Sequence, residues 1–134
     1  KCAHWQAIAV AASEQCGRTQ VPHVAPVAAL SAWLHGLGAA AAGEVDGRWL
    51  LSLAAEAGGL PQHWRAQRSL TMLSGPEGGL AADEQSLALQ HGFVAVRLGP
   101  RVLRADTAPL AALAWLGLQA LSAELPPRPE AAQT

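Results

Sequence analysis

The sequence predicts an α/β fold, in which a mainly parallel sheet is flanked by helices. Three short apolar runs of strand length alternate with helical segments, and this alternation is typical of parallel sheets. A length of 134 residues is enough for one domain with a buried core. Because 51% of the residues are hydrophobic and 14% are charged, a disordered chain is excluded.

The N-terminal part of the chain is predicted to contain two helices. Residues 2–16 form the first, and Gly17 ends it because glycine is favoured just past a helix C-terminus. Residues 21–26 are extended between two prolines, residues 27–35 suit a short helix, and residues 36–47 form a loop. The apolar stripe of the first helix, whose tryptophan we expect in the core, comprises Trp5, Ile8, Ala9, Ala12 and Cys16.

Three strands are predicted in the rest of the chain, over residues 48–53 (RWLLSL), 69–73 (SLTML) and 93–98 (FVAVRL). Residues 58–68 connect the first two. A helix over residues 81–91 begins with acidic residues, which the helix dipole favours in a first turn.

The last helix is predicted to begin at Asp106 or Thr107, either of which can cap it, and to extend to about Glu124. It is apolar on nearly every face, and such a helix must be covered on both sides. The sheet covers one side, and a second copy of the chain is the simplest cover for the other, so we expect a homodimer. The apolar positions are Leu110, Leu113, Trp115, Leu116, Leu118 and Leu121.

Two glycine–proline loops directly follow strands and are the clearest sign of a binding site. Residues 75–79 (GPEGG) follow the second strand and residues 99–104 (GPRVLR) follow the third. In open α/β sheets, ligands bind at the carboxyl ends of the strands. Neither loop matches the phosphate-binding patterns GxxxxGK or GxGxxG, and Glu77 would repel a phosphate.

The chemistry of these loops leaves two interpretations open. Proline stiffens a loop, while Gly78 and Gly79 permit backbone geometry closed to other residues. A rigid loop that offers peptide groups suits an uncharged ring such as adenine, and a nearby carboxylate suits a cation. S-adenosylmethionine (AdoMet) contains both. The alternative is that GPEGG is only a tight strand-to-helix turn.

Three segments, taken together, indicate a family. They are residues 4–18 (HWQAIAVAASEQCGR), 73–84 (LSGPEGGLAADE) and 98–113 (LGPRVLRADTAPLAAL). They resemble, in order, the signature segments of the ribosomal RNA uridine N-3 methyltransferases, the small-subunit methyltransferase E family. Three ordered motifs that cover most of the chain are far more specific than one.

The resemblance implies a SPOUT-type α/β knot, in which the C-terminal segment of a mainly parallel sheet forms a trefoil knot. It further implies AdoMet as cofactor, a uridine N-3 of small-subunit ribosomal RNA as target, and an active site formed across a homodimer. The implied cofactor-binding residues are Leu53, Gly75, Pro76, Glu77, Gly78, Gly79, Leu98, Gly99, Leu103, Arg104 and Thr107.

The candidate catalytic residues are Arg101, Arg104 and Asp106. The two arginines suit phosphate or the anion that develops on uridine, and Asp106 could act as a base. The alternatives are an ion pair between an arginine and Asp106 or Glu77, and helix capping by Asp106. We interpret Arg97 as a cation at the sheet edge.

Glu14 and Arg18 are candidate RNA-binding residues, although an ordinary solvated helix end explains them equally well. Two departures from the family pattern stand out. Asp106 replaces the usual glutamate, and Ala81 replaces a serine that would cap a helix.

We expect residues 1–125 to be the C-terminal part of a SPOUT methyltransferase domain, with the family's N-terminal PUA-like RNA-binding domain and first strand absent. Residues 126–134 are expected to form a disordered tail. A net charge of −1 is low for an RNA binder. The rival interpretations are a SPOUT methyltransferase acting on another RNA, and a truncated fragment that dimerises or binds cofactor without catalysis.

The remaining composition excludes other classes. Cys2 and Cys16 form no disulfide or metal pattern, and we interpret them as buried thiols of a cytoplasmic protein. His4 and His91 have no metal-ligand spacing, so no metal is expected. Since no apolar run approaches the roughly 18 residues of a membrane span, no membrane association is expected.

Overall fold

The computed structural model describes residues 1–37, 46–54, 57–60 and 69–124. The chain divides into two compact units, Lys1–Gly36 and Leu37–Thr134. The expected tail, residues 126–134, lies outside the described residues, and so does most of the loop expected over residues 36–47.

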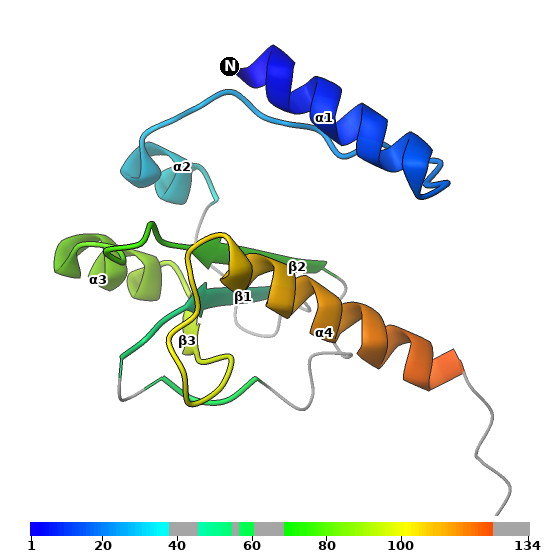
Figure 1. Cartoon of the computed structure of the whole chain (residues 1–134). Coiled ribbons are helices and arrows are strands. Elements are labelled where there is room, and N and C mark those ends of the chain that lie inside the picture. The colour runs from blue at the N-terminus through cyan, green and yellow to red at the C-terminus, as the bar shows by residue number, and fades with distance from the viewer. Residues whose placement is uncertain (38–45, 55–56, 61–68, 125–134) are drawn as a thin grey trace, which may run out of the picture. The chain divides into compact units, whose positions relative to one another are not determined.

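The N-terminal unit contains two helices, α1 (Cys2–Gln15) and α2 (Leu30–Gly36) (Figure 1). The first helix is confirmed, with Gly17 adopting a left-handed φ of 70° just beyond its end. The second helix begins three residues later than predicted, and the backbone N–H of Trp33 donates to the carbonyl oxygen of Ala29 in its first turn.

The buried face of α1 is not the predicted stripe. Trp5 and Ile8 are exposed, whereas Ser13 is buried and donates its hydroxyl to the Ala9 carbonyl. The Gln6 side chain explains this face, because it donates to the Pro22 carbonyl oxygen and accepts from the Val24 backbone N–H. A polar side chain that satisfies an extended segment therefore orients the helix, and hydrophobic periodicity does not.

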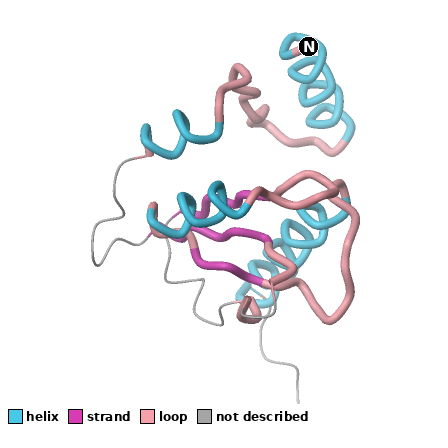
Figure 2. The backbone as a smooth tube through the Cα atoms, turned by 90° about the vertical axis from the view of Figure 1, so that its left-hand side faces the viewer, coloured by secondary structure: helices cyan, strands magenta, loops and turns pink. Residues whose placement is uncertain are grey.

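The C-terminal unit is built on a three-stranded sheet (Figure 2). Its strands are β1 (Asp46–Leu51), β2 (Ser69–Ser74) and β3 (Val94–Val96), in the order β2-β1-β3. Both pairs are parallel, which confirms the predicted fold class. Because β1 pairs with β2 on one side and β3 on the other, all three carboxyl ends meet at one edge.

All three strands differ from the prediction by one or two residues at one end or both. β1 ends at Leu51 and not at residue 53, and β2 ends at Ser74 and not at residue 73. β1 includes Asp46 and Gly47, which were expected in a loop, because both pair with the start of β2. β3 is shorter than expected, since its pairing with β1 extends only from Val94 to Val96.

The sheet is packed by two helices, α3 (Ala82–Gln90) and α4 (Thr107–Glu124). The ring centroids of Trp49, on the central strand, and Trp115, on α4, lie 6.2 Å apart with the ring planes inclined by 52°. Aromatic pairs at this separation stabilise a core beyond the area that they bury. The buried hydrophobic residues of this unit are Trp49, Leu50, Ala88, Phe93, Val96 and Ala112.

Polar contacts fix both ends of α3. At its start the Glu84 carboxylate accepts from the Ala81 backbone N–H at 2.9 Å, whereas Ala81 offers no side-chain cap. At its end the Arg48 guanidinium donates to the His91 carbonyl oxygen at 2.7 Å. A cation is favourable at a helix C-terminus, so a β1 side chain stabilises the helix that follows β2.

One side of α4 packs on the sheet, and leucines of the same helix are exposed in the part of the chain that the structure describes. Leu110, Leu113 and Leu118 are 55–66% exposed, whereas Ala112 is buried. The cysteines are free, but the expectation that both are buried is wrong, since Cys16 is exposed and Cys2 only half-buried.

Candidate functional site

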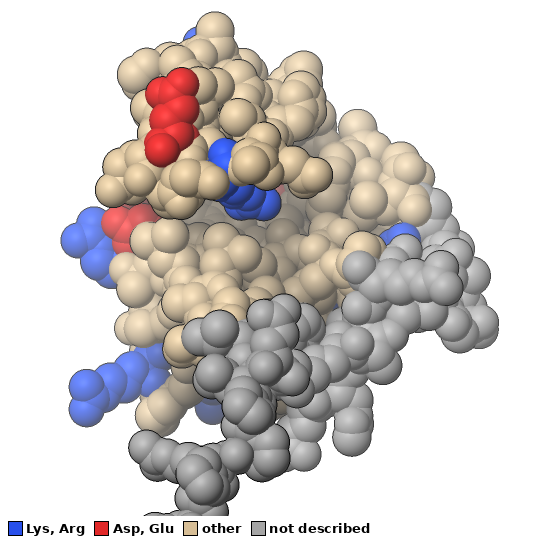
Figure 3. Space-filling view, turned by 90° about the vertical axis from the view of Figure 1, so that its right-hand side faces the viewer, with Lys and Arg blue, Asp and Glu red and all other residues tan. Residues whose placement is uncertain are grey.

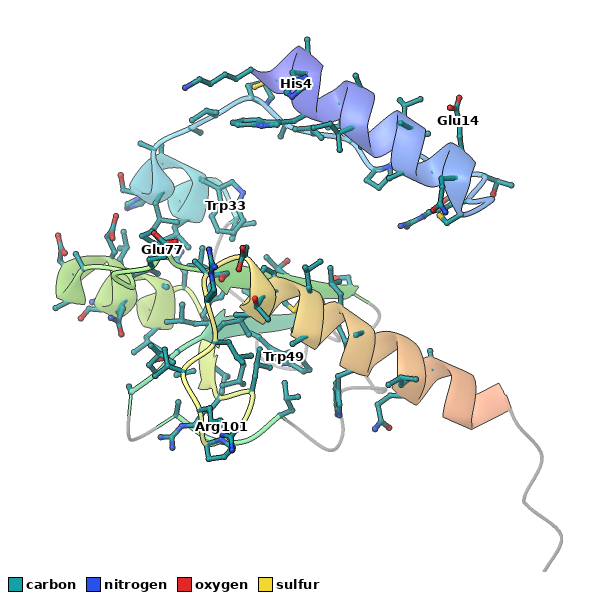
Figure 4. The ribbon with its side chains drawn as sticks, viewed as in Figure 1. His4, Glu14, Trp33, Trp49, Glu77 and Arg101 are labelled. Atoms are coloured by element: carbon teal, nitrogen blue, oxygen red, sulfur yellow. The ribbon has the colours of Figure 1, made fainter. Side chains whose placement is uncertain are left out.

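A cavity of about 270 Å³ opens at the carboxyl ends of the three strands. Three segments form its wall, one following each strand, as the topology predicts for an open parallel sheet. Two charged side chains of opposite sign come from different segments, Glu77 from the one after β2 and Arg101 from the one after β3 (Figure 4).

The segment after β2 is a closed turn. The backbone N–H of Gly79 donates to the Pro76 carbonyl oxygen at 2.8 Å, and Gly79 has a φ of 76°, a conformation that favours glycine. A Cβ atom at Gly75 would lie 2.9 Å from the backbone nitrogen of Leu80. The loop therefore folds back so closely that only glycine fits at position 75.

The end of this turn is held by α3. The Gln85 side-chain amide donates to the Leu80 carbonyl oxygen at 2.9 Å. Both residues line the cavity, so the helix that the loop introduces also fixes the loop.

The segment after β3 passes the cavity and enters α4. Gly99 has a φ of 137°, and the Arg104 carbonyl oxygen accepts from the backbone N–H groups of Thr107 and Ala108 in the first turn of the helix. The Arg104 guanidinium lies 3.7 Å from the Asp106 carboxylate, and both side chains are exposed. An exposed pair of this kind contributes little to stability.

Residues 52–54 follow β1 and line the cavity on the third side. Leu53 is 59% exposed at the cavity. Its neighbour Ser52 accepts a hydrogen bond from the Ala54 backbone N–H through its hydroxyl, at 3.1 Å.

Most residues proposed for the cofactor line this cavity, and some do not. Arg104 and Thr107 are not part of the lining, and neither is Gly99. Of the candidate catalytic residues, Arg101 lines it, whereas Asp106 does not. The proposed cofactor-binding residues in the lining are Leu53, Gly75, Pro76, Glu77, Gly78, Gly79, Leu98 and Leu103.

The two candidate RNA-binding residues, Glu14 and Arg18, lie at the exposed end of α1 in the N-terminal unit. The Arg18 backbone N–H donates to the Ser13 carbonyl oxygen at 2.9 Å and closes the helix. The role of these two residues in RNA binding stays a prediction.

Sequence reasoning missed several residues of the lining. Ser52, Ala54 and Ser74 lie at strand ends beside the predicted loops, and this position is the signal that would have found them. Arg97 was interpreted as a sheet-edge cation, but it lines the cavity and donates to the Ala54 carbonyl oxygen.

The lining combines apolar residues with a few charged ones. It includes six leucines and three glycines, and its charged residues are Glu77, Arg97 and Arg101. Small-molecule sites typically combine an apolar lining with a few placed polar groups.

Other site types find no support in the part of the chain that the structure describes. No cluster of at least three His, Cys, Asp or Glu residues there could hold a metal ion. Among the same residues, no helix has both the length and the apolar character needed to cross a bilayer.

A family model described as an RNA methyltransferase domain matches residues 1–117. The chain belongs to this RNA methyltransferase family. The match covers the whole N-terminal unit, most of the C-terminal unit and all three segments around the cavity.

Curated relatives in the family are named ribosomal RNA small subunit methyltransferase E. The protein from Buchnera aphidicola is 30% identical over 118 residues, which are 87% of this chain and 45% of the relative. That from Synechocystis is 33% identical over 123 residues, covering 87% of this chain and 38% of the relative. The chain thus spans less than half the length of these relatives.

A solved structure agrees with the sequence matches. The methyltransferase E of Neisseria gonorrhoeae, crystallised with bound S-adenosylmethionine, superposes with a TM-score of 0.76 and 34% identity. The superposition covers 88% of this chain and 47% of that protein. This likeness confirms the predicted fold class, a mainly parallel sheet flanked by helices, for this member of the RNA methyltransferase family.

Proposed function

We propose that this chain is the C-terminal part of an AdoMet-dependent methyltransferase that methylates N-3 of a uridine in small-subunit ribosomal RNA, in the cytoplasm. The single observation that supports it best is the cavity, which three segments line at the strand ends of a chain belonging to an RNA methyltransferase family. The Neisseria relative, which was crystallised with bound S-adenosylmethionine, supports AdoMet as the cofactor.

The residues of the cavity fit AdoMet. A Cβ atom at Gly78 or Gly79 would have no heavy atom within 4 Å, so the backbone there leaves room for a flat ring to approach. Leu53, Leu98 and Leu103 would cover the faces of an adenine. The Glu77 carboxylate offers a partner to a cationic group, and Arg101 offers one to a carboxylate.

AdoMet would supply an electrophilic methyl group on its sulfonium. The protein would then act mainly by positioning, since an in-line displacement needs its two reacting atoms aligned. Uridine N-3 must lose its proton before or during the attack. Arg101, one of two arginines that the segment after β3 contributes to the lining, would stabilise the negative charge that develops on the uracil ring.

The homodimer is part of this proposal. The exposed leucines of α4, Leu110, Leu113 and Leu118, make an apolar face on a helix whose other side is already packed. A second copy of the chain would cover that face and bring two cavities into one particle. Burying such a face stabilises an association in proportion to the apolar area removed from water.

Calorimetric titration of this chain with AdoMet and S-adenosylhomocysteine tests the cofactor site. Gly79→Trp should abolish binding, because the indole would fill the cavity. Gly17→Trp is the matched control, since Gly17 has a similar φ of 70° and does not line the cavity. Equal binding by the two variants, or no binding by the folded wild-type dimer, would contradict the proposal.

A second candidate function is a cofactor-binding and dimerising fragment that transfers no methyl group by itself. The observation that favours it is the net charge of −1, since the chain has nine Lys and Arg residues and ten Asp and Glu residues. On the face shown in Figure 3 the described basic side chains stand apart and form no patch. RNA binders usually gather such charges along one surface.

A methylation assay separates the two candidates, and a third in which another RNA is the substrate. Unmethylated small subunits, transfer RNA and AdoMet labelled in the methyl group are incubated with this chain, and the labelled nucleoside is identified by mass spectrometry. We expect N-3-methyluridine in small-subunit RNA. Label elsewhere would contradict the target, and saturable AdoMet binding without label would favour the fragment.

A further inference from the structure

Arg97 stands where β3 ends and joins two stretches of chain that follow β1. Its Nη2 atom donates to the carbonyl oxygen of Ala54 at 2.8 Å. Its backbone N–H donates to the carbonyl oxygen of Gly58 at 2.7 Å. Since Arg97 and Ala54 both line the cavity, one residue of the β3 end holds the wall contributed by the β1 side.

The sheet holds this wall only as far as Ser52. β1 pairs with β3 as far as Leu51, and the Ser52 backbone N–H adds one hydrogen bond to the Val96 carbonyl oxygen at 3.0 Å. Gly58 bridges Val96 again further along. Leu53 and Ala54 lie between these two points, where the chain has left the ladder, and the Arg97 guanidinium reaches the chain there.

The hydrogen bond from the Arg97 guanidinium is suited to holding the backbone at Ala54 in place. The Ala54 carbonyl oxygen also accepts from the Ala57 backbone N–H at 3.1 Å, so the guanidinium is the second donor to this oxygen. Hydrogen bonds from a charged donor such as a guanidinium are roughly twice as strong as neutral ones. Arg97 is half-buried, which limits competition from water.

We propose that Arg97 is a positioning residue, which holds Leu53 and Ala54 in the shape that binds AdoMet. This inference rests on the proposed function. Arg97 acts through the backbone of its neighbours, so its loss should weaken the binding of any ligand that contacts the β1 side of the cavity. The charge on the ligand should make no difference.

The test compares Arg97→Met and Arg97→Lys with Arg48→Met as the matched control. Arg48 also donates to carbonyl oxygens from a strand, but it does not line the cavity. The ligands, titrated calorimetrically, are AdoMet and 5′-methylthioadenosine, which lacks the amino-acid part. Arg97→Met should raise the Kd of both by about tenfold, equivalent to about 1.4 kcal/mol, as expected for a hydrogen bond from a charged group.

Arg97→Lys keeps the charge and a donor and should recover part of the affinity. Arg48→Met should melt earlier yet bind both ligands within about threefold of the wild type, because its contacts are remote from the cavity. Binding by Arg97→Met within twofold of the wild type would overturn the inference. A loss of affinity for AdoMet without a loss for 5′-methylthioadenosine would also overturn it, since that result indicates direct contact between Arg97 and the amino-acid part of AdoMet.

Hydrogen exchange separates this inference from the proposed function. In the ligand-free chain, the Ala57 amide should exchange faster in Arg97→Met than in the wild type, because its acceptor has lost its second partner. If the wild type binds no AdoMet, the proposed function fails, and the exchange rates alone then test whether Arg97 holds the backbone at Ala54. An unchanged exchange rate of the Ala57 amide in Arg97→Met would overturn the inference.

Discussion

Gly75→Ala should destabilise the protein and weaken cofactor binding, whereas Gly78→Ala, in the same loop, should not destabilise it. A Cβ atom at Gly75 would lie 2.9 Å from the Leu80 nitrogen, 3.1 Å from the Gly79 carbonyl carbon and 3.3 Å from the Gly79 Cα. All three are backbone atoms, so no side chain can rotate away and the loop itself must open. A Cβ atom at Gly78 would meet nothing within 4 Å.

The size of the effect follows from two opposing terms. Overpacking of this kind costs roughly 1–3 kcal/mol. Replacing glycine by alanine also restricts the unfolded chain, which stabilises the folded state by about 0.4–1 kcal/mol. Gly75→Ala should therefore lose about 1–2 kcal/mol net, a fall in Tm of roughly 3–10 °C for a chain of this size. Gly78→Ala keeps only the favourable term, since its φ is not positive.

Thermal unfolding followed by circular dichroism gives the Tm of both variants. Titration with S-adenosylhomocysteine gives their affinity for a ligand of the cavity. Gly75→Ala should also bind at least about tenfold more weakly, because Gly75 and Gly79 both line the cavity. A Gly75→Ala protein that melts within 1 °C of the wild type and binds equally well would refute the close-approach argument. A Gly78→Ala protein that loses as much stability would show that the loop tolerates no Cβ anywhere.

Three further predictions concern the fold and its assembly. Trp115→Ala should lower the free energy of unfolding, measured with urea, by about 3 kcal/mol, because it leaves Trp49 without its aromatic neighbour. Leu89→Ala, on the exposed face of α3, should lower it by less than about 0.5 kcal/mol. Equal losses in the two variants would contradict the packing. Ala81→Ser should add about 1 kcal/mol of stability in the same assay, because a serine oxygen would cap α3 beside the Glu84 contact, and no gain would mean that residue 81 is not the cap. Replacing Leu110 and Leu113 by arginine should shift the sedimentation coefficient to that of a monomer, because both leucines belong to the exposed apolar face of α4. Val102→Arg, at an exposed loop residue, should leave the sedimentation coefficient unchanged. A dimer that persists with both leucines replaced would place the interface elsewhere.

The loops that line the cavity could be predicted because their residue types are restricted by backbone geometry. Gly79 and Gly99 have positive φ values, and such positions favour glycine strongly enough to be read from the sequence. The strands could be predicted because each is a short apolar run. Ser52, Ser74 and Arg97 were missed because serine and arginine occur in any loop or strand end, and only the packing brings them to the cavity.

The face of α1 could not be predicted correctly, for a similar reason. Hydrophobic periodicity indicated Trp5 and Ile8, but two hydrogen bonds of Gln6 orient the helix. The two hydrogen bonds that one polar side chain makes to backbone groups outweigh a weak apolar stripe, and the one from the Val24 N–H is partly shielded from water. The partner of those hydrogen bonds lies in a segment that periodicity does not connect to the helix.

By itself the sequence determined the parallel α/β class, the helices and strands to within a few residues, and the two loops at the strand ends. These depend on local periodicity and on residues with restricted backbones, which are properties of short stretches. The tertiary structure alone decided the order β2-β1-β3, the pairing of Trp49 with Trp115, and the contact between Arg97 and Ala54. Arg97 and Ala54 are 43 residues apart in the chain. A contact across that distance depends on how the strands pair, and no local pattern encodes it.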